Sequence, residues 1–339
     1  MKLDAVLHTI DDLSAIPGTA ASAEERGFDA LWATEVQHDP FIQLALAATG
    51  TEHITLGTAI ALSFTRSPMT LAHTCWDLAA LSKGRFILGL GTQVKAHNEK
   101  RFSVPWGPPV PRLREVILAL RAIWDCWREG TRLNFRGEHY SFTLMTPFFT
   151  PPRHRYPIPI WIAGVNTGLC RLAGELCDGF HIHPLNSPTY IRQVVLPAIK
   201  EGANKSGRRR EDIELSASVF VVTGETPEQI EFLRGMVRQQ ISFYASTPSY
   251  RVIFEIHGWG GVAEELSRLA ARKRWDEMPA LVTDEMLATF AVVASPEAIM
   301  AATRERYQGL LDRVTFYLPY VPGGPFEFLW ATALNSAER

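Results

Sequence analysis

The stretch ITLGTAIALSFTRSPMTLAHTCWDLAALSKGRFILGLG, residues 54–91, decides the fold of this chain. Residues 54–62 and 85–91 are short continuous apolar runs, the pattern of strands buried on both faces. Residues 68–81 between them carry apolar side chains at helical spacing. Two buried strands joined by one helix form a βαβ unit, whose strands must be parallel. Because active sites of barrels form where parallel strands end, the stretch also indicates where to look for chemistry.

The same alternation of apolar runs and helical periods continues along all 339 residues. Strands are predicted at residues 3–9, 30–35, 54–62, 85–91, 158–164, 180–183, 214–223 and 313–318. Helices are predicted at residues 20–26, 42–49, 68–81, 112–128, 167–176, 190–205, 227–244, 296–307 and 325–334. Eight strands alternating with helices indicate an α/β fold, a (β/α)8 TIM barrel, as a single domain over residues 1–339. A doubly wound open sheet is the alternative, but no GxGxxG follows the first strand.

Two segments depart from this alternation and are predicted as insertions. Residues 95–110, after the fourth strand, form an irregular piece that contains three prolines. Residues 246–279, after the seventh strand, are of mixed character, and a small hairpin is expected around Gly137. Because long segments without regular structure are commonly functional, we expect residues 95–110 and 246–279 to act as lids.

Composition and charge argue against several classes of function. A formal net charge of −2 gives no field that would hold nucleic acid or an anionic membrane. No window offers about twenty uninterrupted apolar residues, so no membrane span is expected. The N-terminal residues lack the apolar run of a signal peptide. Four cysteines without a CxxC pair indicate neither a disulfide framework nor a zinc site, so a reducing cytoplasm is the expected compartment.

Candidate site residues gather where the predicted strands end. The turn at residues 164–168 leads into a helix, so its free N–H groups and the helix dipole could bind an anion. The alternative is an ordinary N-cap at Asn166 or Thr167. His38 could act as a general acid or base, or could cap the next helix. His181 and His183 share a strand face; we favour ring contacts to a ligand or the core over metal binding, and no metal site is predicted.

The motifs LGTAIAL (56–62), SKGRFILGLGT (82–92), IAG (162–164) and CDGFHIHP (177–184) together resemble the luciferase-like monooxygenase superfamily. The resemblance runs from the first strand to the eighth. The pattern E..HDPF at residues 35–41 is most similar to the branch that uses the deazaflavin coenzyme F420, whereas the other large branch uses FMN. It implies a non-prolyl cis peptide bond at Ala59–Ile60, behind the deazaflavin ring. It further implies cofactor contacts for Thr92, Gln93, Asn98, Gly164, Val165 and Asn166, with the phosphate held at Gly164 and Val165.

The same resemblance places a ring contact at Glu35 and a catalytic histidine at His38. One position departs from the sugar-phosphate dehydrogenases of the superfamily, which carry a glutamate as proton donor in the loop after the fourth strand. This chain has Gln93 there. Because an amide cannot donate a proton as an acid, that substrate becomes doubtful and His38 becomes the better acid–base candidate.

These features predict an F420-dependent oxidoreductase that transfers a hydride between the deazaflavin and a small organic substrate. His38 would move the proton, and Glu35 would orient His38 or contact the ring. The alternatives are an FMN-dependent monooxygenase on the same barrel, a non-catalytic flavin-binding protein and a metal-dependent hydrolase. Because relatives are often dimers, we expect a homodimer, with no nucleic-acid or membrane partner.

Overall fold

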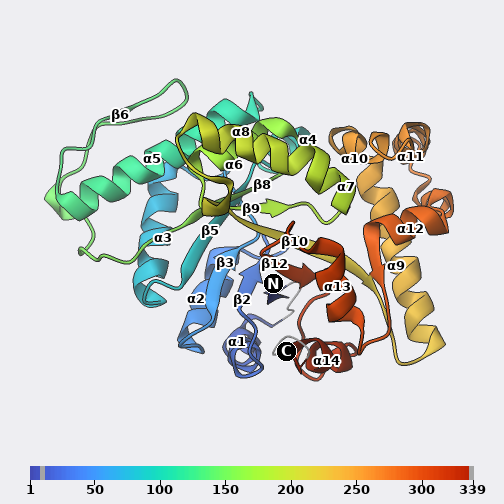
Figure 1. Ribbon diagram of the computed structural model, residues 1–339. Helices are drawn as coiled ribbons and strands as arrows, with labels where there is room; N and C mark the ends of the chain where they lie inside the picture. The colour runs from blue at the N-terminus through green and yellow to red at the C-terminus, as the bar shows by residue number, and fades with distance from the viewer. Residues whose placement is uncertain (8–11, 336–339) are drawn as a thin grey trace.

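A closed barrel of eight parallel strands forms the centre of the protein (Figure 1). The computed structural model describes residues 1–7 and 12–335. Around the barrel the strands are β1 (Lys2–Leu7), β2 (Ala30–Ala33), β3 (Thr55–Thr58), β5 (Phe86–Gly91), β8 (Ile160–Gly164), β9 (Gly179–Ile182), β10 (Glu214–Val222) and β12 (Arg313–Phe316). Pairing of β12 with β1 closes the ring, and all its ladders are parallel. This confirms the predicted (β/α)8 barrel.

Helices surround the barrel and cover its rim. They are α1 (Ile16–Glu25), α2 (Pro40–Thr49), α3 (Pro68–Leu81), α4 (Lys95–Lys100), α5 (Pro109–Glu129), α6 (Thr167–Leu176), α7 (Pro188–Tyr190), α8 (Leu196–Lys205), α9 (Pro227–Ala245), α10 (Arg251–Glu255), α11 (Gly260–Ala271), α12 (Asp284–Phe290), α13 (Ile299–Tyr307) and α14 (Glu327–Asn335). Four of them begin with proline after a capping residue, and the capping side chains of Asp39, Ser67, Ser187 and Thr226 each accept a backbone N–H of the first turn. Within the described part of the chain, no helix is long and apolar enough to cross a membrane.

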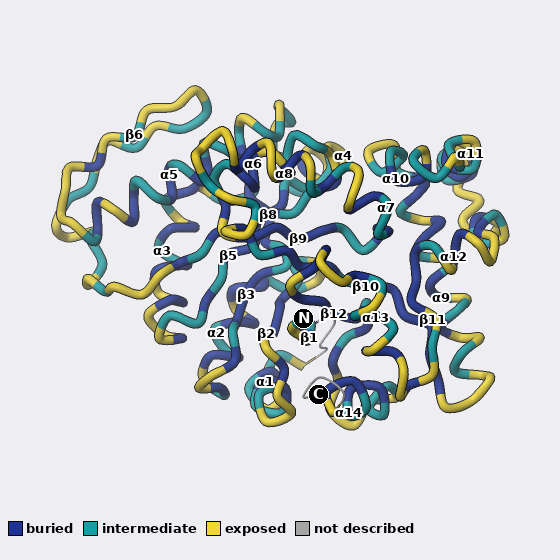
Figure 2. The backbone as a smooth tube through the Cα atoms, viewed as in Figure 1, coloured by how far each residue is buried: buried dark blue, intermediate teal, exposed yellow. Residues whose placement is uncertain are grey.

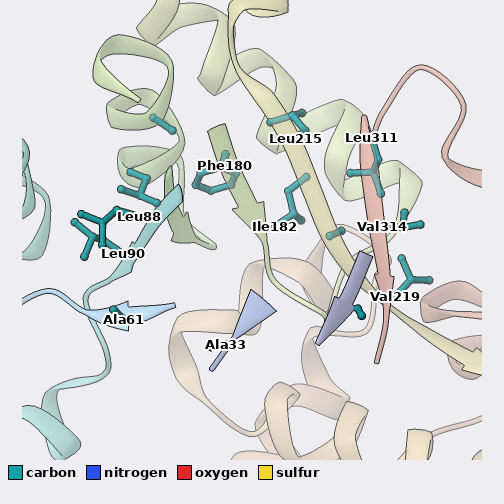
Figure 3. Packing of buried hydrophobic residues seen from close by; sticks show 14 of the residues in the cluster. Ala33, Ala61, Leu88, Leu90, Phe180, Ile182, Leu215, Val219, Leu311 and Val314 are labelled. Atoms are coloured by element: carbon teal, nitrogen blue, oxygen red, sulfur yellow. The ribbon is translucent and has the colours of Figure 1, made fainter. Parts of the chain in front are cut away.

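Alternation along the strands separates two layers of buried side chains. Outward residues pack against the helices, and Figure 3 shows part of this layer, with Leu88 and Leu90 on β5 and Phe180 and Ile182 on β9. The inward residues Ala30, Trp32 and Trp161 form a separate small cluster inside the barrel. The strands are therefore buried on both faces, as their continuous apolar runs predict (Figure 2).

A buried ion pair closes the interior of the barrel near the start of its strands. Arg313 on β12 donates to both carboxylate oxygens of Asp4 on β1, at 2.7 and 2.8 Å. The indole N–H of Trp32 donates to the same carboxylate at 2.8 Å. The guanidinium also lies over the rings of Trp32 and Trp161, 5.7 and 5.9 Å from their centroids. These groups form a floor below any site at the opposite end of the strands.

The structure corrects several predicted boundaries. The strand predicted at residues 54–62 is divided into β3 and β4 (Ala61–Leu62) by a cis peptide bond at Ala59–Ile60. The expectation that residues 95–110 are irregular is wrong at their start, because α4 occupies Lys95–Lys100. The mixed segment 246–279 is helical, carrying α10, α11 and two 3-10 turns.

Two smaller features complete the architecture. A further strand that was not predicted, β11 (Ala291–Val293), pairs with the end of β10. The hairpin expected around Gly137 is present as β6 (Phe135–Arg136) and β7 (Ser141–Phe142), and it projects beyond α5 (Figure 1).

Candidate functional site

The first part of the rim is the backbone after β3, which carries the cis peptide bond Ala59–Ile60 implied by the family resemblance. Side chains after β2 brace this backbone. The Glu35 carboxylate accepts the N–H of Leu62 at 2.7 Å and a guanidinium N–H of Arg66 at 2.8 Å. Arg66 also donates to Asp39 at 2.7 Å. Glu35 therefore fixes β4 relative to β2.

His38 is half-buried and lies between Glu35 and Asp39 in the sequence, in the turn that leads from β2 into α2. The N-cap of α2 is Asp39, whose carboxylate accepts the N–H of Phe41 at 2.8 Å. The alternative in which His38 caps this helix is therefore wrong. A role of His38 in proton transfer stays a prediction.

The loop after β5 is held by one buried amide. Asn98 is 1% exposed, and its Nδ2 donates to the carbonyls of Thr92 and Val94 at 2.9 and 3.2 Å. Its Oδ1 is buried without a hydrogen-bond partner. Gln93 has a positive φ of 55°, and its side chain accepts the N–H of Val94 at 2.9 Å. Thr92 and Gln93 thus occupy a backbone conformation that Asn98 stabilises.

The turn after β8 brings a helix N-terminus to the rim. Asn166 occupies the N-cap of α6, but its side chain makes no capping hydrogen bond. The first N–H groups of α6 therefore lack the side-chain partner that a capped helix has. Val165 is buried, and its carbonyl accepts the hydroxyl of Tyr190. Gly164 is needed for close packing, because a Cβ there would lie 2.6 Å from the Cβ of Leu169.

His181 forms the base of the site inside the barrel. Its ring lies 4.8 Å from that of Trp32 and 4.9 Å from that of Trp161, measured between centroids. Burial and, after it, the charge of Arg313 lower the pKa of His181 to about 3. Its Nε2 is buried and has no hydrogen-bond partner among the described residues. The neutral ring is thus a core residue, as the favoured interpretation held.

A second half of the rim, which sequence reasoning largely missed, is formed by side chains from five segments: the ends of β9, β10 and β12, helix α9 and the 3-10 turn that follows it. We call it the aromatic wall, and it consists of His183, Phe220, Gln240, Tyr244, Tyr250 and Tyr317. Position alone could have suggested His183 and Tyr317, because each follows the end of a barrel strand. No comparable signal marks Tyr244 and Tyr250, which come from α9 and the segment after it.

The segment predicted as the second lid contacts this wall. The ring of Tyr250 lies 4.3 Å from that of His183. His257 makes a 2.8 Å hydrogen bond with the hydroxyl of Ser187, which caps α7. Tyr244, near the end of α9, also contacts the ring of His183, so the part of the chain that contributes to the wall begins before Ser246. Lid function for residues 95–110 and 246–279 stays a prediction.

Other candidate sites in the described residues lie elsewhere. The group of possible metal ligands consists of Glu115, Glu138 and His139, at the β6–β7 hairpin, and includes neither His181 nor His183. Glu115 there accepts three backbone N–H groups of the hairpin, which accounts for its position. A cavity of about 620 Å³ lies at the other end of the barrel, lined by residues that include Arg210 and Asp312.

Comparison with known proteins identifies the family. The family model described as luciferase-like monooxygenase matches residues 2–313. This chain belongs to that family. The uncharacterized protein Rv1360 of Mycobacterium tuberculosis is 45% identical over 315 residues, covering 93% of this chain and 92% of the relative. An F420-dependent glucose-6-phosphate dehydrogenase of Intrasporangium calvum is 30% identical over 277 residues, covering 75% and 78% of the two chains.

Solved structures agree on the fold of this luciferase-like chain. The coenzyme F420-dependent tetrahydromethanopterin reductase of Methanopyrus kandleri superposes with a TM-score of 0.78 at 22% identity, covering 98% of this chain and 96% of that one. The EDTA monooxygenase of Chelativorans sp. BNC1 superposes with a TM-score of 0.77 at 15% identity, covering 100% and 93%. At such identities the likeness shows the barrel alone. The F420-dependent relative from Intrasporangium calvum supports the F420-dependent branch of the family.

Proposed function

We propose that this protein is an F420-dependent oxidoreductase that transfers a hydride between the deazaflavin and a small organic substrate. The observation that carries the proposal is its 30% identity, over three quarters of the chain, to an F420-dependent dehydrogenase. The alternative is an FMN-dependent monooxygenase, which the likeness to EDTA monooxygenase in fold keeps open.

The residues at the rim fit such a cofactor. The uncapped N-terminus of α6, with Gly164, Val165 and Asn166, would hold an anionic phosphate. The buried Oδ1 of Asn98 has no hydrogen-bond partner in the structure and could accept one from a bound molecule. The backbone at Ala59 and Ile60, with Thr92 and Gln93 opposite, would contact the ring.

Bound F420 would supply a ring carbon that accepts or gives a hydride and reacts poorly with oxygen. The protein must then position the substrate and move one proton. His38 would accept the hydroxyl proton of an alcohol, or return a proton to the oxygen when the reaction runs in reverse. Glu35 would act as a positioning residue, since its carboxylate is bonded to Leu62 and Arg66.

A fluorescence titration of the purified protein with F420 and with FMN tests this proposal. We expect F420 to bind tightly and FMN to bind at least about tenfold more weakly, a difference of about 1.4 kcal/mol. Equal affinity, or tighter binding of FMN together with oxygen consumption, would overturn it. A His38→Ala variant should keep F420 affinity and lose turnover, which separates an enzyme from a non-catalytic flavin-binding protein.

The remaining expectations are part of the same proposal. We propose that the protein acts in the cytoplasm as a homodimer on a small-molecule substrate. Light scattering coupled to size-exclusion chromatography tests the dimer, whose mass would be twice the 37.9 kDa of one chain.

A further inference from the structure

The geometry points to an uncharged organic molecule as the ligand of the aromatic wall, held by stacking and by neutral hydrogen-bonding groups. This inference deepens the proposed function, because it names the substrate class of that site. It argues against assigning to this chain the sugar-phosphate substrate for which the 30% identical relative is named.

The wall presents ring faces at the carboxyl end of the barrel. His183 follows β9, Phe220 lies on β10, and Tyr317 follows β12, so all three stand at strand ends. The Phe220 and Tyr317 rings are 4.8 Å apart, and those of His183 and Tyr244 are 4.5 Å apart. Phe220 is buried and the other wall residues are half-buried, so a ligand can reach their side chains.

The polar atoms of the wall are neutral. The hydroxyls of Tyr244 and Tyr317 share a 2.6 Å hydrogen bond, and Tyr317 donates to Oε1 of Gln240 at 3.4 Å. Nδ1 of His183 accepts the N–H of Leu185 at 3.1 Å, so the neutral ring carries its proton on Nε2. The wall therefore offers one imidazole N–H donor and phenolic oxygens that can accept.

No charged side chain bonds to the wall or stacks on it within residues 12–335. Burial lowers the pKa of His183 to about 3 and raises those of Tyr244, Tyr250 and Tyr317, which keeps each group neutral near pH 7. A carboxylate or phosphate placed here would lose hydration without gaining a cation. An uncharged alcohol or carbonyl compound would lose far less hydration free energy and would gain aromatic contacts.

Binding of a matched pair of probes to the cofactor-free full chain tests the inference. Benzyl alcohol and benzoate share a ring and differ in charge, and saturation-transfer NMR reports their binding without turnover. We expect benzoate to bind at least about tenfold more weakly than benzyl alcohol. Equal or tighter binding of benzoate, or binding of neither probe, would overturn the inference.

Three variants locate the binding. Tyr317→Phe removes one hydroxyl and should weaken the binding of benzyl alcohol about three- to tenfold, the range for one net hydrogen bond. Tyr156→Phe is the matched control, because Tyr156 packs against Gly84 at the other end of the barrel, and it should change nothing. Gln240→Lys adds a cation to the wall and should raise benzoate affinity at least about tenfold.

If Tyr317→Phe and Gln240→Lys leave both affinities unchanged, the ligand does not sit on the wall and the inference is wrong. Failure of the proposed function is distinguishable, because a protein that does not bind F420 would still show the probe preference. Conversely, a protein that binds F420 but prefers benzoate would overturn the substrate class alone.

Discussion

Replacing Asp4 by asparagine removes one charge from the most deeply buried ion pair of the barrel. The Asp4 side chain is 0% exposed and that of Arg313 is 3% exposed. Burial raises the pKa of Asp4, and the hydrogen bonds and charge of the Arg313 guanidinium oppose that shift. In Asp4→Asn the cation stays buried, with Glu214 at 3.1 Å as its remaining acidic partner.

Removing one member of a buried pair costs about 3–5 kcal/mol, because the other charge is left without compensation. Glu214 is 29% exposed and offsets part of this loss, so we expect Asp4→Asn to lower the free energy of unfolding by about 3 kcal/mol. Urea denaturation followed by tryptophan fluorescence measures it. Lys2→Gln breaks an exposed pair with the same Glu214 and should cost less than about 1 kcal/mol.

A double variant separates charge from packing. Asp4→Leu combined with Arg313→Met removes both charges and keeps apolar volume, so it should be more stable than Asp4→Asn. The reasoning is refuted if Asp4→Asn loses no more than the Lys2 control, or if the double variant is the less stable of the two. Either result would mean that Asp4 and Arg313 stabilise the floor of the site by packing and not by the attraction between their charges.

Three further predictions concern the site itself. Asn98→Ala removes both hydrogen bonds that hold the loop after β5, so the dissociation constant for F420 should rise about tenfold in the fluorescence titration; an unchanged value would contradict the role of the loop. Gly89→Ala places a Cβ 1.9 Å from a backbone oxygen and should destabilise by more than about 3 kcal/mol in urea denaturation, whereas Gly235→Ala, in open space on α9, should be neutral or stabilising. Burial lowers the pKa values of His181 and His183 from 6.5 to about 3, so in acid the unfolded chain binds protons that the folded chain does not. The free energy of unfolding should therefore fall below pH 6.5 by up to about 1.4 kcal/mol per pH unit for each of the two histidines. The variant His183→Asn should make this pH dependence less steep.

Much of the fold could be predicted because the strands of this barrel are buried on both faces. Continuous apolar runs located all eight barrel strands, and the predicted bounds of α3 and α6 agree with the structure. The split between β3 and β4 could not be read from composition, since a backbone turn at Ala59–Ile60 leaves the apolar run unbroken. The cis peptide bond at this position was predicted only from the resemblance to the family. β11 was missed because three residues pair only with the end of β10.

The candidate site was predicted unevenly for a physical reason. Thr92 directly follows β5 and Gly164 is the last residue of β8, so sequence position fixes their place at the rim. Tyr244 and Tyr250 reach the rim from α9 and the segment after it, through contacts between residues distant in the chain. Such contacts leave no local pattern. Glu35 was placed correctly at the rim, but its bonds to Leu62 and Arg66 depend on packing that no motif reveals.

The two halves of the rim therefore carry different kinds of information. Most motifs that mark the family lie on β3, β5 and β8, where backbone geometry governs what can bind. The aromatic wall draws on β9, β10, β12 and the helices after β10, and most of its residues lie outside those motifs. A relative at 30% identity can keep the first half and change the second. Cofactor class can then be argued from the family, whereas substrate class must be argued from the wall, whose neutral hydroxyls and rings offer no cation to an anionic substrate.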